Sequence, residues 1–361
     1  MTNADSLAQN PVLVFDWGNT VMKVWPQYSG PMAHWPEVAA VDGISAVLDA
    51  LKSRYTLVLA SNAGDSDASL VRNALSRVGL DKAFQAVFTA HELNARKPQV
   101  TFFRRLESAL NRPPHHLILI GDDYTTDVLG AKQAGWQAIW YNPGGQPAPG
   151  LLPLHDEEIL HLRALPEVLN RRPLPDYTQT LAWLLETGTP FNILNHIQLV
   201  AAVAYLLAIW LRAAGQPVNP ILTQRGAMLH DLAKITSIHL RRERGVHGDH
   251  ARMAADVLLA RNQPELAAIA DRHMPVSDPS AGRAPVTWEE KLVHFADKLA
   301  EGACLVTPAE RFAALLDRYP DFQAELQASQ PHLLRLQDEI CALLRLSPDE
   351  LFARLKQAVS F

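Results

Sequence analysis

The hydrophobic pattern of the chain changes at a short segment rich in arginine and proline, Arg-Arg-Pro-Leu-Pro-Asp, which begins at Arg171. Before this segment, apolar runs of strand length alternate with helical stretches, which is typical of a parallel sheet covered by helices. After it, helical periodicity dominates. With 361 residues, two domains are expected. We therefore predict an α/β domain over residues 1–170, a linker over residues 171–178 and an all-α domain over residues 179–361.

A second segment rich in breakers, residues 142–150, is predicted to lie inside the first domain. Its sequence is Asn-Pro-Gly-Gly-Gln-Pro-Ala-Pro-Gly, which indicates a loop. A strand at Ile159–Leu162 and a short helix at Leu165–Leu169 are predicted to follow it. These two elements would complete the sheet, so the domain boundary is expected after them.

Composition excludes several classes of function. The net charge of −5 and the pI near 6.3 give no electrostatic attraction to nucleic acid or to an anionic membrane. Cys304 and Cys341 are the only cysteines, which fits a reducing compartment. Residues 1–10 lack the pattern of a signal peptide. The longest apolar run, residues 199–211, is too short to span a bilayer. We expect a cytoplasmic protein with no nucleic-acid or membrane partner. The oligomeric state is not indicated.

Polar residues follow three apolar runs of the first domain. Asp16 follows the run Pro11–Phe15, Ser61 follows Leu57–Ala60, and Asp122 follows a run that ends at Ile120. Such runs are typical of buried parallel strands, and the carboxyl ends of parallel strands are where open α/β sheets bind ligands. The sequence therefore predicts that these side chains meet at one edge of the sheet.

These motifs, together with Lys97 before a helical stretch at 99–110 and Asp127 after Asp122, resemble the haloacid dehalogenase (HAD) superfamily over roughly residues 10–170. The resemblance implies a Rossmann-like fold and a phosphatase that forms an aspartyl-phosphate on Asp16. It implies that Lys97 neutralises charge, and that Asp122, with Asp16 and with Asp127 or Asp123, holds Mg²⁺. The implied phosphate contacts are Thr20, Ser61, Asn62 and Lys97.

One position departs from the usual HAD pattern. Gly18 stands where most HAD phosphatases carry a second aspartate, which serves as general acid and base. Loss of such a group commonly costs about 10²–10⁴ in rate. Only about forty residues separate Thr20 from Ser61, and a helix at Gly43–Arg54 is predicted to take many of them. We therefore expect a minimal cap domain and an open site.

The second half contains a vicinal imidazole and carboxylate, His230-Asp231, at the end of an apolar stretch. Further potential ligands lie in separate predicted helices. Imidazole and carboxylate together suit divalent ions such as Fe, Mn or Zn. A lone His-Asp pair is weak evidence, whereas a larger set in order is strong. The candidate ligands are His196, His230, Asp231, His250, His273 and Asp297.

This order of ligands and its local contexts resemble the HD superfamily of metal-dependent phosphohydrolases. The resemblance implies one ion with the minimal ligand set, and a second ion where His250 and His273 are present, with Asp231 as the bridge. It implies that a metal-activated hydroxide attacks phosphorus and that Lys234 helps to hold the phosphate. His247 and His294 are expected to be outer donors or uninvolved.

The sequence thus indicates a bifunctional phosphohydrolase with Mg²⁺ in the first domain and one or two divalent transition metals in the second. Its substrates would be phosphate esters of a small metabolite or nucleotide. An alternative of another class stays open: the first domain, degenerate at Gly18, binds a phosphorylated ligand and regulates the second as a sensor or scaffold.

Overall fold

The computed structural model describes residues 11–244, 248–278, 280 and 282–359. It divides into two compact units, one made of Met1–Gln146 and Leu154–Pro173, the other of Pro147–Pro153 and Leu174–Phe361. The break at Pro173 falls inside the segment predicted as a linker. The seven residues Pro147–Pro153, which sequence analysis placed in the first domain, instead group with the second unit.

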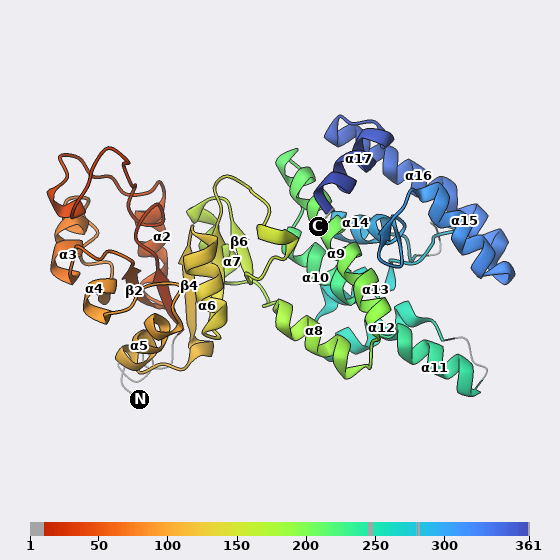
Figure 1. Ribbon diagram of the computed structural model, residues 1–361, viewed down its shortest axis with the longest axis horizontal. Coiled ribbons are helices and arrows are strands. Elements are labelled where there is room, and N and C mark those ends of the chain that lie inside the picture. Colours follow the sequence, from red (N-terminus) through yellow and green to blue (C-terminus); the bar gives the residue numbers. More distant parts are fainter. Residues whose placement is uncertain (1–10, 245–247, 279, 281, 360–361) are drawn as a thin grey trace. The chain divides into compact units, whose positions relative to one another are not determined.

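A six-stranded sheet forms the centre of the first unit (Figure 1). The strand order is β3-β2-β1-β4-β5-β6, and every neighbouring pair is parallel. This confirms the predicted Rossmann-like α/β fold. The strands are β1 (Val12–Phe15), β2 (Thr56–Ser61), β3 (Ala86–Thr89), β4 (Leu117–Gly121), β5 (Gln137–Tyr141) and β6 (Glu157–Ile159).

The two central strands explain why the apolar runs were readable in the sequence. Every residue of β1 and of β4 is buried, as expected for strands covered on both faces. The strand order reverses between β1 and β4, which lie side by side with Phe15 opposite Ile120. In open sheets this switch point is where ligands bind.

Helices of the first unit pack in pairs, α2 against α7 and α5 against α6. Between β1 and α2 the only helical element is a 3₁₀ turn at Met32–His34, so the cap segment is short. The helices are α2 (Ile44–Leu51), α3 (Ala68–Ser76), α4 (Ala90–Leu93), α5 (Val100–Leu110), α6 (Gly130–Gln133) and α7 (Leu165–Val168), and a π-helical turn at Tyr124–Leu129 precedes α6.

The second unit is helical, as predicted, apart from one small hairpin. Its strands, β7 (Ala300–Glu301) and β8 (Cys304–Leu305), pair across a two-residue turn in which Gly302 has φ +57°. The helices are α8 (Tyr177–Glu186), α9 (Phe191–Ala213), α10 (Pro220–Leu229), α11 (Lys234–Arg244), α12 (His250–Ala260), α13 (Pro264–Asp271), α14 (Trp288–Asp297), α15 (Pro308–Arg318), α16 (Gln323–Leu344) and α17 (Pro348–Val359).

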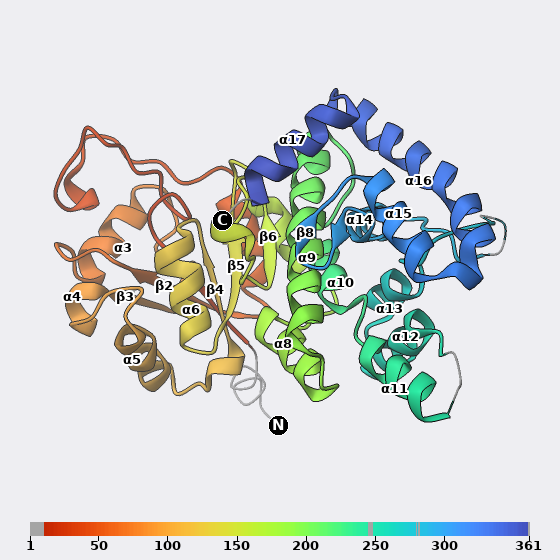
Figure 2. The ribbon, with the colours of Figure 1, turned by 45° about the vertical axis from the view of Figure 1, so that its right-hand side comes forward.

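The long helix α9 forms the centre of this unit. It packs against α10 and α14, and Figure 2 shows α9 beside α10. By length and composition it is the one helix of the described chain that could cross a membrane, but 61% of its most apolar window is buried. Burial of this kind is typical of a core helix that is apolar all round.

Candidate active sites

The first candidate site lies at the carboxyl edge of the parallel sheet. Asp16 follows β1, Ser61 ends β2, and Asp122 follows β4. The backbone N–H of Asp16 donates to the carbonyl of Ile120 at 2.9 Å, which fixes the two strand ends together. The Ser61 hydroxyl oxygen accepts from the N–H of Ala63 at 2.9 Å, so its own O–H can still be donated.

Lys97 is the centre of charge in this site. Its Nζ lies 2.5 Å from Asp16 Oδ1 and 2.6 Å from Asp127 Oδ1, and the side chain is 1% exposed. Burial alone would lower the pKa of Lys97, but the carboxylates of Asp127 and Asp16 outweigh burial and raise it. Lys97 is therefore a permanent cation beside the carboxylate predicted to be the nucleophile.

Asn62, which is predicted to contact phosphate, has hydrogen-bond partners within the protein. Its Oδ1 accepts from the Lys97 N–H at 2.8 Å, and its Nδ2 donates to the Lys97 carbonyl at 3.0 Å. Both polar atoms of the amide are therefore engaged with one backbone residue. Asn62 therefore positions Lys97, and its predicted contact with phosphate stays a prediction.

Three carboxylates of the first site are close enough to share one ion. Oxygen atoms of Asp16, Asp122 and Asp127 all lie within 4.8 Å of one another. Burial and then the charge of Asp16 raise the pKa of Asp122 to about 6. Burial and the charge of Asp16 also raise the pKa of Asp127, to about 7. When all three carboxylates are ionised, their charge exceeds that of Lys97 by two negative charges. Such an oxygen-only, anionic set fits a hard divalent cation.

Two neighbours of this cluster have hydrogen-bond partners within the protein. Thr20 Oγ1 donates to Asp122 Oδ1 at 3.1 Å, so it orients a carboxylate. The Asp123 side chain accepts from the Thr126 N–H at 2.7 Å and caps the following helical turn, which separates it from the cluster. Asp127 is therefore the acidic partner of Asp122. Trp140, which sequence analysis missed, donates from Nε1 to the Asp122 carbonyl at 3.0 Å.

The second candidate site lies where the ends of several helices of the second unit meet. His230 and Asp231 follow α10, His250 is the first residue of α12, and Asp297 is the last residue of α14. His196 lies in the second turn of α9, and His273 lies just after α13. The structure brings all six predicted ligands together.

Asp231 divides these ligands into two groups. Its Oδ2 lies 3.5 Å from His230 Nε2 and 4.0 Å from His196 Nε2. Its Oδ1 lies 3.3 Å from His250 Nε2 and 3.7 Å from His273 Nε2. Each group has three ligand atoms within 4.8 Å of one another. One carboxylate therefore faces two potential metal positions.

Asp297 completes the first group, because its Oδ1 lies 3.0 Å from His196 Nε2 and 3.8 Å from His230 Nε2. The other ring nitrogen of each of three histidines meets a backbone carbonyl. His230 Nδ1 lies 2.6 Å from the Ala227 carbonyl, and His196 Nδ1 lies 3.2 Å from that of Gly302. His273 Nδ1 lies 2.6 Å from the carbonyl of Ala270. A proton donated from Nδ1 leaves Nε2 as a metal ligand.

Unpaired buried atoms show that the residues fit a metal. Within the described chain, His230 Nε2 and Asp231 Oδ1 are buried and have no hydrogen-bond partner. Buried polar atoms without a partner are rare in folded proteins. Burial alone would raise the pKa of Asp231, but the charges of Lys234 and His230 outweigh it and hold the pKa well below its usual value. The carboxylate is therefore ionised and available to a cation.

Two lysines pair with the two carboxylates of the helical site. Lys234 Nζ lies 2.5 Å from Asp231 Oδ2, so the residue predicted to hold phosphate contacts the carboxylate shared by the two ligand groups. Lys298, which sequence analysis missed, lies 2.5 Å from Asp297 Oδ2 and donates to the His273 carbonyl at 2.8 Å. Its only sequence signal is its place directly after Asp297.

His294 is not a ligand in this arrangement. Its side chain is buried, and its Nδ1 lies 3.1 Å from the His273 carbonyl. Burial, followed by the charge of Lys298, lowers the pKa of His294 to about 3. It is therefore a neutral donor that supports the His273 backbone. His247 lies outside the described residues.

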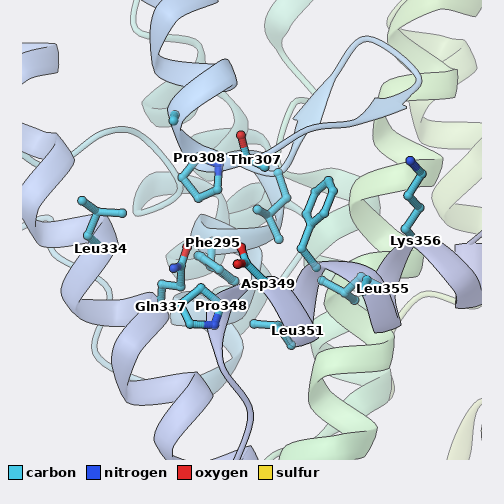
Figure 3. Close-up of a pocket in the computed structure, with 14 residues that line it drawn as sticks. Phe295, Thr307, Pro308, Leu334, Gln337, Pro348, Asp349, Leu351, Leu355 and Lys356 are labelled. Carbon is cyan, nitrogen blue, oxygen red and sulfur yellow. The ribbon is translucent and has the colours of Figure 1, made fainter.

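A separate cavity of about 450 Å³ lies among α14, α15, α16 and α17 (Figure 3). Its lining is mostly apolar and includes Phe295 and Leu299. Phe295 is two residues before Asp297 in α14, which is roughly 200° around the helix axis. The cavity therefore lies behind α14 and is distinct from the cluster of metal ligands.

Comparison with known families agrees with both sites. The chain matches the Haloacid dehalogenase-like hydrolase family over residues 12–141, a range that includes every residue of the sheet-edge site. It matches the HD domain family over residues 193–302, which includes all six ligands of the helical site. The two resemblances inferred from the motifs are thus confirmed.

Individual relatives cover parts of the chain. Pyrimidine 5'-nucleotidase PynA of Streptococcus pneumoniae is 30% identical over 28% of this chain and 43% of its own length. Putative HAD-hydrolase YfnB of Bacillus subtilis is 28% identical over 36% and 54%, respectively. The chain thus spans about half the length of these relatives.

Among solved structures, an uncharacterized protein from Listeria monocytogenes serotype 4b is 24% identical, with a TM-score of 0.40, and the alignment covers 44% of this chain and 96% of that one. The two family matches agree with the parallel sheet and with the helical ligand cluster. Together they show which two domains the chain contains. The protein joins a haloacid dehalogenase-like hydrolase domain to an HD domain in one chain.

Proposed function

We propose that the protein is a bifunctional phosphohydrolase with one metal-dependent site in each domain. The observation that carries the proposal is the division of ligands around Asp231, which would let the HD domain hold two adjacent metal ions. Divalent ions there would activate water and polarise the phosphoryl group. The chain's own residues orient the ligands, because three histidines have their Nδ1 atoms against backbone carbonyls and so keep Nε2 available to a metal.

For the HAD domain we propose a phosphomonoesterase that uses Asp16 as nucleophile. Lys97 contacts Asp16 Oδ1, so the second carboxylate oxygen is the one that attacks phosphorus. As the new O–P bond forms, the bond from phosphorus to the leaving oxygen breaks. Water then attacks phosphorus and releases Asp16. Lys97 neutralises part of the charge of the approaching dianion, and Mg²⁺ held by the three carboxylates would supply further positive charge.

Gly18 limits the proposed leaving groups. The leaving oxygen must be protonated unless it is a stable anion, and Gly18 has no proton to offer. Aryl and acyl phosphates are therefore expected to react faster than alkyl phosphates. The competing function, ligand sensing by a degenerate HAD domain, predicts binding of a phosphorylated compound without turnover.

The test uses the full chain, because Pro147–Pro153 belongs to the HD unit while both of its ends continue into the HAD unit. Phosphate release from a panel of aryl, alkyl and nucleotide phosphates is measured for the wild type, Asp16→Asn, Asp231→Ala and the double variant. Two active sites predict that each single variant loses a different set of substrates and that the double variant is inert. If Asp16→Asn changes no rate, yet the Asp231→Ala protein still binds a phosphate ester, the sensor function is correct.

A further inference from the structure

A group of charged side chains next to the HD ligands has no part in the function proposed so far. Glu301 on β7 accepts hydrogen bonds from two arginines of α15, Arg311 Nη1 on Oε2 and Arg318 Nη2 on Oε1. We call these three residues the Glu301 cluster. One carboxylate thus gathers two guanidinium groups at the side of the metal site.

Arg311 is the inner member of the Glu301 cluster. It is 6% exposed, and its Nη2 lies 3.9 Å from Asp297 Oδ1, the oxygen that faces His196. Its Nε is buried and has no hydrogen-bond partner within the described chain. A buried donor without an acceptor is unfavourable. An anion bound beside Asp297 would give this guanidinium the acceptor that the protein does not supply.

The outer member reaches solvent on the same side. The Arg318 side chain is 49% exposed and interacts with the side chain of Tyr319. Tyr319 also interacts electrostatically with Lys234. Cationic groups therefore extend from Lys234, at the bridging carboxylate, to Arg318 at the surface.

The charge of this region exceeds what a single phosphate needs. Four cationic side chains surround three carboxylates, which leaves one positive charge before any metal ion is counted. Each divalent ion adds two more, whereas a phosphate monoester carries at most two negative charges. The cations are Lys234, Lys298, Arg311 and Arg318, and the carboxylates are Asp231, Asp297 and Glu301. The region therefore suits a more anionic ligand.

We propose that Arg311 and Arg318 form a subsite for a second phosphate group, adjacent to the one held at the HD metal positions. Guanidinium groups bind phosphate through paired N–H donors, which favours arginine at such a place. The substrate class of the HD domain would then be compounds with a diphosphate group, either inorganic or attached to a nucleoside. This inference rests on the proposed function of the HD site.

Calorimetric binding to the metal-loaded full chain tests the subsite without relying on turnover. The probes are inorganic phosphate, methylenediphosphonate and α,β-methylene-ADP, the last of which adds a nucleoside. Either diphosphonate should bind the wild type more tightly than phosphate does. Arg311→Gln should weaken diphosphonate binding by about 10- to 100-fold and change phosphate binding by no more than about twofold. Tighter binding of α,β-methylene-ADP than of methylenediphosphonate would assign the nucleoside form.

Metal content, measured on the same samples, separates the possible failures. If the wild type binds no metal and no phosphate, the proposed HD function is wrong. If it holds metal but binds both diphosphonates no better than phosphate, only the subsite is wrong. Equal weakening of phosphate and diphosphonate by Arg311→Gln would also overturn the subsite. Arg318→Gln, at a half-exposed position that should leave folding intact, must reproduce the selective loss, and Arg335→Gln on the exposed face of α16 must not.

Discussion

The two metal-ligand clusters of the chain differ in how their charges are balanced. In the HAD domain, Lys97 lies between two carboxylates, and the cluster carries an excess of two negative charges when all three carboxylates are ionised. In the HD domain, Lys234 and Lys298 balance two carboxylates, yet buried ring and carboxylate atoms lack partners. A cation at the first cluster would neutralise its excess negative charge. A cation at the second cluster would give a partner to ligand atoms that have none among the described residues.

This difference indicates which ion suits each site and how tightly each site should hold its ion. Oxygen ligands with excess negative charge favour Mg²⁺, which binds weakly and keeps much of its water. Nitrogen-rich ligands that are already oriented favour transition metals. We expect the HD ions to be part of the folded structure and the HAD ion to exchange readily.

The largest expected effect is the loss of HAD catalysis in Asp16→Asn. Removing the nucleophile should reduce aryl phosphate hydrolysis by that site by at least about 10³-fold. The rate is measured in an Asp231→Ala background, so that only the HAD site contributes. Asp123→Asn is the matched control, because asparagine caps a helix as well as aspartate does. Equal losses of rate in both variants would mean that the loss comes from removing one negative charge. This outcome would contradict the role of Asp16 as nucleophile.

Chelation should separate the two domains by stability. Removing ions present at about a thousand times their Kd costs about 4 kcal/mol of unfolding free energy. For a unit of this size, the HD transition should fall by roughly 10 °C in scanning calorimetry of the full chain, and the HAD transition by much less. Asp231→Ala should show the lowered transition without chelator. Equal shifts of both transitions would remove the distinction between the sites.

His273→Ala should remove one ion of two, because His273 faces only Oδ1 of the bridging Asp231. Elemental analysis after loading with excess metal measures the ratio. His239→Ala, on the exposed side of α11, should keep both ions. A wild-type ratio of one, unchanged in His273→Ala, would reduce the HD site to a single metal position.

The pH dependence of Mg²⁺ binding should sharpen the same contrast. Burial and Asp16 raise the pKa of Asp122 to about 6, and Mg²⁺ binds only the ionised carboxylate. Burial and Asp16 also raise the pKa of Asp127 to about 7, so protons compete with Mg²⁺ below about pH 7. The apparent Kd should rise by about tenfold per pH unit between pH 7 and 6, and more steeply below pH 6, where both carboxylates take up a proton. Titration of Mg²⁺ from pH 5 to 8 measures this. A Kd that is flat from pH 5 to 7 would contradict the raised pKa.

The smallest expected effect is a gain of less than about tenfold in alkyl phosphate turnover for Gly18→Asp. A Cβ at position 18 would lie 3.0 Å from Val24 Cγ2, and the φ of Gly18 is outside the left-handed region. Val24 is 44% exposed and can move. Gly18→Asp combined with Val24→Ala should therefore gain at least as much as the single variant. If both lose activity on alkyl phosphates, the missing acid does not limit this site.

The sequence predicted the folds well, because a buried strand and the aspartate that follows it form one short consecutive segment of the chain. It also picked out six candidate HD ligands that the structure brings together, because five of them stand at or just beyond a helix end and His196 lies in the second turn of α9. The roles of Thr20 and Asn62 were not predictable, since their partners are 102 and 35 residues away. The grouping of Pro147–Pro153 with the HD unit depends on a buried arginine, Arg225, which donates to the Pro153 carbonyl. No pattern in the sequence indicates that bond.

The most direct test of two chemically different sites is elemental analysis of the full-length protein in three forms: wild type, Asp16→Asn and Asp231→Ala. Each is loaded with metal and then passed through a desalting column. We predict two transition-metal ions per chain in the wild type and in Asp16→Asn, and none in Asp231→Ala. Transition metal that remains in Asp231→Ala, or that is lost in Asp16→Asn, would contradict the account.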